Sequence, residues 1–180
     1  MNIEIDLDKN IEILNSRLGE SFDIVIREIT DFRGVRAAVV FSDGLVDKEL
    51  IAGEIIRPLL GYAMDSKEKK RRGRTAQGLM QRIISTVDVE EEQDMDRALT
   101  GVLSGDTVIF FDGADNCFMA QTRKWQSRSI STPDTQQSVR GPKEGFTETL
   151  LFNAAMLRRK IKSDRLALEA VKIGTVTKTD

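Results

Sequence analysis

The sequence contains no histidine, and this absence excludes several kinds of active site at once. Neither a Ser-His-Asp or Cys-His nucleophilic relay nor a histidine-based metal site can be built. The single cysteine, Cys117, excludes an intrachain disulfide and fits a reducing compartment. Acid–base chemistry would fall to carboxylates and lysines, and no pair of carboxylates has a spacing typical of an active site. We therefore expect a protein that is not an enzyme and holds no cofactor.

Long apolar runs are also missing. No segment approaches the roughly 18–20 uncharged apolar residues that are needed to cross a bilayer. Residues 1–6 are acidic and lack the basic start and apolar core of a signal peptide. With 40% hydrophobic residues, 31% charged residues and a formal net charge of −2, the composition is that of a globular domain and argues against general nucleic-acid binding. The sequence alone predicts a soluble, cytosolic chain.

Two further kinds of site lack their sequence pattern. Residues 101–105 contain too few glycines for a phosphate-binding loop. The acidic residues between 90 and 96 lack the Asp-x-Asp-x-Asp-Gly spacing of a calcium loop. We interpret them as acids that lead into the first turn of a helix, and we expect no metal ion.

The strongest charge run is basic, at residues 67–74, and it has three interpretations. A solvated loop between two helices is the plain one. Contact with anionic lipid headgroups, worth roughly 1 kcal/mol for each basic residue near the surface, is a functional one. Nucleic acid is the third, but the net charge leads us to expect no nucleic-acid partner.

Hydrophobic periodicity predicts interleaved helices and strands. Helices are expected at residues 8–18, 47–60, 76–84 and 94–103, and strands at residues 22–29, 35–41, 86–90, 107–111, 117–123 and 170–176. Asp47 is expected to cap a helix, Gly105 to end one, and Pro58 to kink or shorten one. Residues 128–138 are rich in Ser, Thr and Gln and predict an exposed loop. The pattern predicts an α/β domain with a mixed β-sheet and flanking helices.

The most informative stretch lies toward the C-terminal end and combines a turn, a proline-started helix and a basic helix end. Gly141 suits an N-cap, and Pro142 suits the first helical position, where no N–H is needed. Glu144 then falls in the first turn, where the helix dipole favours a carboxylate. Arg158 and Arg159 fall in the last turn, where the dipole favours cations.

One face of this predicted helix is apolar. Its members repeat at helical spacing, and they are Phe146, Leu150, Leu157 and Ile161. We call these four residues the apolar stripe and expect it to be buried. Asn153 lies on the same face, where a polar amide needs partners, so we predict a specific internal contact for it.

Several residues of this stretch have both a structural and a functional interpretation. Arg140 is either an interface or ligand anchor or a structural arginine that pins the loop to the domain. Gly141 and Gly145 are interpreted as backbone requirements rather than as ligand contacts. Glu148 and Arg158 either contribute to an ion network or are solvated helix charges.

The run Arg-Gly-Pro-Lys-Glu-Gly-Phe-Thr-Glu at residues 140–148 is followed by Asn153 and by a basic triplet with an isoleucine at residues 158–161. Together they resemble the signature of the A-subunit family of bacterial spore germinant receptors. The likeness covers nearly the whole chain and is visible earlier, at residues 43–48 and 98–105.

The chain departs from the family pattern near the motif. Residues 132–136 replace a Glu-Pro-x-x-Glu segment, and Lys143 and Lys160 stand where arginine is usual. The expected acidic neighbours of Arg140 are therefore missing, and a lysine cannot reproduce a bidentate guanidinium contact.

The resemblance implies the first subdomain of a cytosolic region that has two α/β subdomains. The parent protein would lie in the inner membrane of the spore, with this region on its cytoplasmic side. On this basis, residues 1–165 form a subdomain that includes the motif helix, and residues 166–180 form a linker or strand that leads toward a second subdomain.

The function that the resemblance implies is non-catalytic. The domain would contribute to receptor assembly, with other subunits and with further copies of itself, and to signal coupling during nutrient-triggered germination. Its motif residues would hold the helix and loop that face the neighbouring subdomain or subunit. The alternative is a small-molecule (nutrient) binding module with a cleft between the two subdomains.

Overall fold

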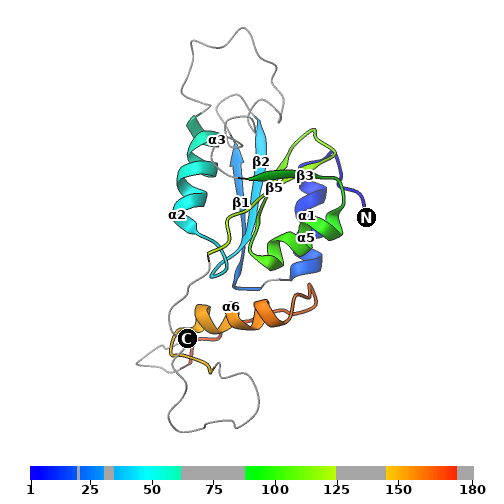
Figure 1. Ribbon diagram of the computed structural model, residues 1–180. Coiled ribbons are helices and arrows are strands. Elements are labelled where there is room, and N and C mark those ends of the chain that lie inside the picture. Colours follow the sequence, from blue (N-terminus) through cyan, green and yellow to red (C-terminus); the bar gives the residue numbers. More distant parts are fainter. Residues whose placement is uncertain (20, 31–34, 62–87, 125–144, 174–180) are drawn as a thin grey trace.

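The computed structural model describes residues 1–19, 21–30, 35–61, 88–124 and 145–173. Within them, a five-stranded sheet has the strand order β1-β2-β4-β5-β3 (Figure 1). The strands are β1 (Ile24–Thr30), β2 (Arg36–Ser42), β3 (Val89–Glu92), β4 (Thr107–Phe111) and β5 (Cys117–Ala120). The predicted hairpin is present as β4 and β5, with Val108 opposite Met119.

The prediction of a sheet with flanking helices is confirmed, but the described pairings are all antiparallel rather than mixed. Interleaved helices usually indicate crossovers between parallel strands. Here the helix before β4 ends at Gly105 beside Leu45, so β4 starts at the end of the sheet where β2 finishes. The chain therefore enters β4 in the direction opposite to β2.

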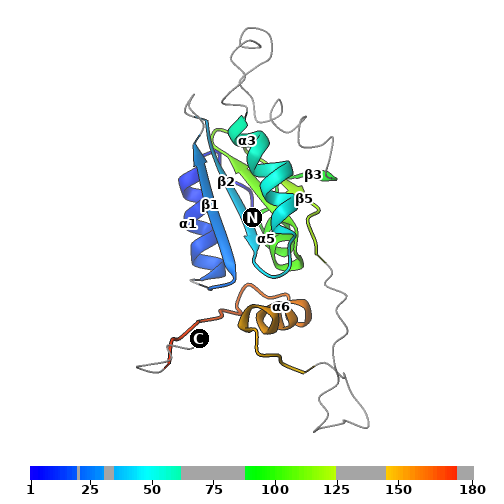
Figure 2. The same cartoon turned by 90° about the vertical axis from the view of Figure 1, so that its left-hand side faces the viewer.

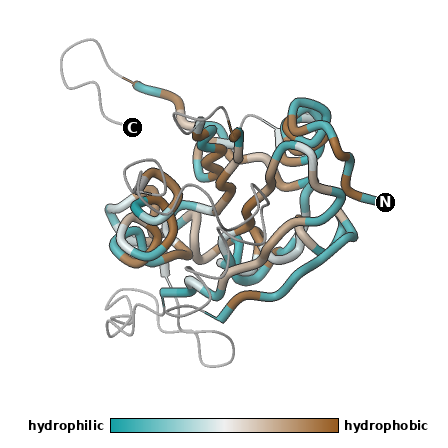
Figure 3. The backbone as a smooth tube through the Cα atoms, turned by 90° about the horizontal axis from the view of Figure 1, so that it is seen from above, coloured by the Kyte–Doolittle hydropathy of each residue, from teal (hydrophilic) through white to brown (hydrophobic). Residues whose placement is uncertain are grey.

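Helices cover both faces of the sheet (Figures 1 and 2). One layer consists of α1 (Leu7–Leu18) and α5 (Met95–Ser104), and the other is a continuous helical segment of α2 (Lys48–Leu50), the π-helical stretch η1 (Ile51–Ile56) and α3 (Arg57–Gly61). Val40 of β2 belongs to the core on the α1 and α5 side, and Val39 belongs to the core on the other side. Hydrophobic and hydrophilic residues alternate along the helices, as expected for elements with one buried side (Figure 3).

The ends of the helices follow the predicted signals. The Asp47 side chain accepts hydrogen bonds from the N–H groups of Glu49 and Leu50, and Gly105 ends α5 in a left-handed conformation at φ +96°. The helical segment continues through Pro58 instead of ending there. The π-helical turns that precede Pro58 are wider than α-helical turns and leave room for the proline ring. The helix therefore continues although Pro58 has no N–H to donate.

Several predicted features have other outcomes. Residues 67–74, 76–84 and 128–138 lie outside the described residues. Of the acidic residues between 90 and 96, Asp94 caps α5 and Asp96 lies in its first turn, as predicted, whereas Glu90 and Glu92 belong to β3. Of the strand predicted at residues 170–176, residues 170–172 form no strand, Ile173 has the backbone of an isolated β-bridge, and residues 174–176 lie outside the described residues. In the part of the chain that the structure describes, no helix is both long and apolar enough to cross a membrane.

Candidate functional site

The helix that carries the motif, α6 (Leu150–Lys160), lies across the end of the sheet, outside both helical layers (Figures 1 and 2). It begins after Thr149 rather than at the predicted Pro142. The Asn153 side chain accepts a hydrogen bond from the Thr147 N–H at 2.7 Å and donates one to the Thr147 carbonyl at 2.7 Å. These local bonds hold the preceding backbone in a non-helical conformation. The Asn153 amide therefore has partners within the chain, as predicted, but they lie in the exposed segment just before the helix and not in the core.

Some of the remaining motif residues lie within the described part of the chain and others do not. Arg140, Gly141, Pro142 and Glu144 lie outside the described residues, so the roles predicted for them stay predictions. Gly145 and Glu148 precede α6 in extended or bent backbone, and the Glu148 side chain is exposed. Arg159 lies half-buried in the last turn of α6.

The apolar stripe faces away from the domain, which contradicts its predicted burial. The exposed fraction is 68% for Phe146, 40% for Leu150 and 45% for Ile161, and Leu157 is half-buried. Only Leu150 and Leu157 lie within α6, because Phe146 precedes the helix and Ile161 is its C-cap, and the side of α6 that carries Ala154 and Ala155 is the buried one. The stripe is therefore a hydrophobic surface that the described residues leave uncovered.

The inward side of α6 carries two alanines where the chain around Gly44 comes close to it. Ala154 and Ala155 are 3% and 1% exposed. At Gly44, which has φ +88°, a Cβ atom would lie 3.2 Å from Leu151 Cγ and 3.3 Å from Ala155 Cβ. Glycine is therefore required at position 44 both by the backbone conformation and by the close approach of α6.

A buried ion pair fixes the C-terminal half of α6. Arg158 Nε donates to Asp23 Oδ2 at 2.8 Å, and Arg158 Nη2 donates to Asp23 Oδ1 at 3.0 Å. The exposed fractions of the two side chains are 0% and 1%. The same guanidinium donates to Ser21 Oγ at 2.8 Å and to the Ser163 carbonyl at 3.3 Å. Arg158 thus belongs to an ion network and is not a solvated helix charge.

Hydrogen bonds from neighbouring segments complete this network. Ser21 Oγ donates to Asp23 at 2.7 Å, and Ser42 Oγ donates to Asp23 at 3.3 Å. The Leu168 N–H donates to Ser21 Oγ at 2.8 Å. We call the side chains of Ser21, Asp23, Ser42 and Arg158, with the backbone groups that they bind, the Arg158 clamp.

The charge of Arg158 decides the ionisation of Asp23. Burial alone would raise the pKa of the Asp23 carboxyl, but the hydrogen bonds from Arg158 and Ser21 outweigh it. As a result the pKa lies below its ordinary value. The carboxylate is therefore charged at neutral pH and paired inside the protein.

Sequence reasoning missed the partners of Arg158. Asp23 lies within the strand that was predicted at residues 22–29, but neither it nor Ser21 nor Ser42 was singled out. A single Asp near a strand start carries no local signal of burial, because its partner lies 135 positions away. Only the placement of α6 across the strand ends brings the two together.

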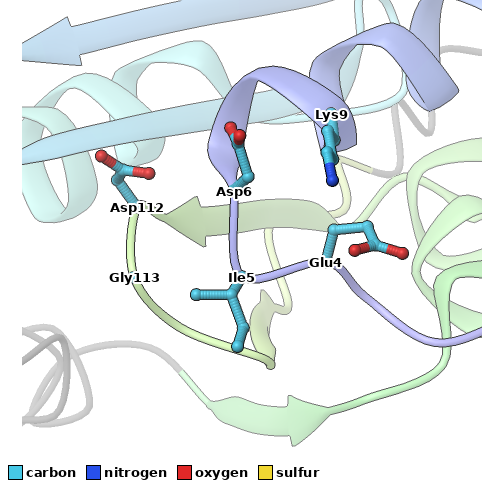
Figure 4. A pocket seen from close by; sticks show the side chains of 6 residues that line it. All are labelled: Glu4, Ile5, Asp6, Lys9, Asp112 and Gly113. Carbon is cyan, nitrogen blue, oxygen red and sulfur yellow. The ribbon is translucent and has the colours of Figure 1, made fainter.

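Two depressions on the surface of the described residues are lined by charged side chains. One is lined by Glu4, Ile5, Asp6, Lys9, Asp112 and Gly113 (Figure 4). Its carboxylates point in different directions instead of converging on one position (Figure 4). Another lies between α5 and the edge of the sheet, where Arg97 pairs with Glu92 at 3.1 Å and Arg123 pairs with Asp106 at 2.7 Å.

The described residues also offer no metal centre or reactive thiol. No three acidic or cysteine side chains among them are placed to hold a metal ion. Cys117 is buried, and burial, together with the nearby charge of Glu92, raises the pKa of its thiol to about 12. A thiol with this pKa is almost fully protonated at neutral pH and is a poor nucleophile.

The arrangement of sheet, flanking helices and terminal helix has counterparts among known proteins. The family described as Bacillus/Clostridium GerA spore germination protein matches residues 12–180. The chain belongs to this family. Spore germination protein KA of Bacillus subtilis (strain 168) is 36% identical over 180 residues, which cover 99% of this chain and 32% of that protein. The uncharacterized membrane protein YfkQ of the same organism is 32% identical, over 99% of this chain and 34% of that protein.

A solved structure supports the same fold. The crystal structure of the N-terminal domain of the A subunit of the Bacillus megaterium spore germinant receptor GerK3 matches with a TM-score of 0.72 and 26% sequence identity. The match covers 98% of this chain and 63% of that one. The chain spans about a third of the length of the relatives KA and YfkQ. The predicted membership of the germinant receptor A-subunit family is therefore confirmed.

Proposed function

We propose that this chain is a non-catalytic domain of a spore germinant receptor A subunit and that it acts in receptor assembly and signal coupling. The observation that carries the proposal is the outward apolar stripe of α6. Three of its four residues, Phe146, Leu150 and Ile161, are at least 40% exposed, and two of them, Phe146 and Ile161, belong to the motif that is typical of the family. We propose that this surface packs against a neighbouring subdomain or subunit.

The size of the stripe and of the matched structure supports this assignment. Large aliphatic and aromatic side chains that are exposed close to one another in the sequence are typical of interaction surfaces. The chain covers 63% of the solved N-terminal domain, so that domain has further chain beyond the matched part. We propose that further chain of this kind covers the stripe. We further propose that the parent protein lies in the spore inner membrane with this domain on its cytoplasmic side.

Germination of spores tests the proposal. Phe146→Ala and Leu150→Ala, introduced together into the full-length protein, should lower the nutrient-triggered germination rate and the amount of subunit in the spore membrane. The matched control is Ile5→Ala, because Ile5 is 62% exposed but lies before α1. Its germination rate and subunit level should stay at the values of the unchanged protein.

The outcomes separate assembly from ligand binding. Normal subunit levels with normal germination in the double variant would contradict the proposal. A normal subunit level with an altered response to one nutrient only would instead favour the nutrient-binding alternative.

A further inference from the structure

α6 is attached to the domain differently from the other long helices. The two apolar cores contain residues of α1 and α5 on one side and of the α2–α3 segment on the other, but no residue of α6. The buried apolar residues of α6 are Ala154, Ala155 and Met156. Alanine buries little apolar area, so these contacts supply less hydrophobic stabilisation than the leucines of α1.

The Arg158 clamp supplies specific contacts to three other segments. Asp23 and Ser21 precede β1, Ser42 ends β2, and the Ser163 carbonyl belongs to the chain that leaves α6. One planar guanidinium thus binds α6 to the strand ends and to its own exit chain.

The exit chain is bound to the sheet by further contacts near the clamp. The Phe22 N–H donates to the Leu168 carbonyl at 2.9 Å. Arg17 of α1 pairs with Asp164 at 2.6 Å. The direction of the chain after α6 is therefore set by the same end of the sheet that holds Arg158.

We propose that the Arg158 clamp is a positioning device, which fixes the register of α6 and the path of residues 163–168 against the sheet. Breaking a buried ion pair on one side is costly, whereas replacing both partners with apolar residues of similar volume is often neutral for stability. What the pair adds is a fixed geometry, because a bidentate guanidinium accepts only one arrangement of its partners. The inference rests on the proposed function in one respect: the apolar stripe is the surface that the clamp holds in place.

Hydrogen exchange on the 180-residue chain tests the clamp without any partner. The main variant combines Asp23→Leu with Arg158→Met, which keeps the volume and removes both charges. We expect its urea midpoint to stay close to that of the unchanged chain. The amides of residues 151–160 and 163–168 should exchange at least tenfold faster, while those of β2 and β4 keep their protection. The control is Arg36→Met, which removes a half-buried arginine paired with the exposed Asp8 and should change the exchange of neither α6 nor the exit chain.

A second variant keeps the test decisive if the double variant does not fold. Arg158→Lys retains the charge but cannot bind Asp23, Ser21 and the Ser163 carbonyl together, so it should also expose α6 and the exit chain to exchange. Unchanged protection of α6 in whichever of the two variants folds would overturn the proposal. Because exchange is measured without receptor partners, this result is independent of the germination result for the stripe.

Discussion

Arg158 and Asp23, separated by 135 positions in the sequence, form an ion pair at 2.8 Å in which neither side chain is more than 1% exposed. The pair joins α6 to the start of β1. A buried pair of this kind is more sensitive to the loss of one partner than to the loss of both, because one unpaired charge remains without water. The first two predictions follow from this asymmetry.

Removing only the arginine should destabilise the domain strongly. Arg158→Ala leaves the Asp23 carboxylate buried without its cation, and we expect the free energy of unfolding to fall by about 3–5 kcal/mol. Urea unfolding followed by circular dichroism measures this change. Arg36→Ala removes an arginine whose partner Asp8 is 61% exposed, so the free energy of unfolding should fall by much less in this variant. If the free energy of unfolding fell equally in the two variants, burial of the ion pair would not contribute to the effect.

The stability of the domain should depend on the charge of Asp23 at acid pH. The folded-state pKa lies below the ordinary value of 3.8, so the pair stabilises the fold above that pH, and the stabilisation is lost as the pH falls through the lower, folded-state pKa. Asp23→Asn should therefore flatten the curve of unfolding free energy against pH below 3.8.

The salt dependence of stability distinguishes the contribution of the buried Asp23 from that of surface carboxylates. The pKa of Asp8 is also lowered, by hydrogen bonding to Arg36, but this pair is exposed to solvent. At 1 M salt the screening length is about 3 Å, and the difference between unchanged and Asp8→Asn chains should largely vanish. The difference for Asp23→Asn should persist, and its disappearance would contradict the burial of the pair.

Gly44 should tolerate alanine less well than another glycine of similar backbone conformation. Gly113 has φ +83° and open space around the position of a Cβ atom, so Gly113→Ala tests backbone strain alone, at about 1–2 kcal/mol. Gly44→Ala adds contacts at 3.2 Å with Leu151, so it should cost more and should loosen α6. Thermal unfolding and exchange of the α6 amides measure the two effects. An equal loss of stability in the two variants would mean that α6 shifts to accommodate the added methyl group without an energetic penalty.

The sequence predicted the local structure of the sheet and of the flanking helices well, because their signals are local. Asp47 starts a helix by accepting hydrogen bonds from N–H groups two and three residues later, and Gly105 ends a helix by its own left-handed conformation. The strand predicted at residues 35–41 is present as β2, and its apolar side chains contribute to both cores.

The candidate site was predicted only in part, since its geometry depends on distant contacts. The period of the stripe was recognised, but periodicity does not say which side of α6 meets the sheet. That choice is made by Arg158 with Asp23 and by the glycine at position 44. The start of α6 was missed because the contact of Asn153 with Thr147 competes with helix formation before Leu150.

Cys117 offers a way to tell loosening of α6 from unfolding of the whole domain. It is fully buried in the core beneath α1 and α5, and its thiol has a pKa raised to about 12. The thiolate is the reactive form, so Ellman's reagent at pH 8 should label the native chain at least a hundredfold more slowly than the urea-unfolded chain. Asp23→Leu combined with Arg158→Met should keep this slow labelling if the clamp positions α6 without holding the sheet together. Fast labelling of that variant would instead mean that breaking the clamp opens the core itself.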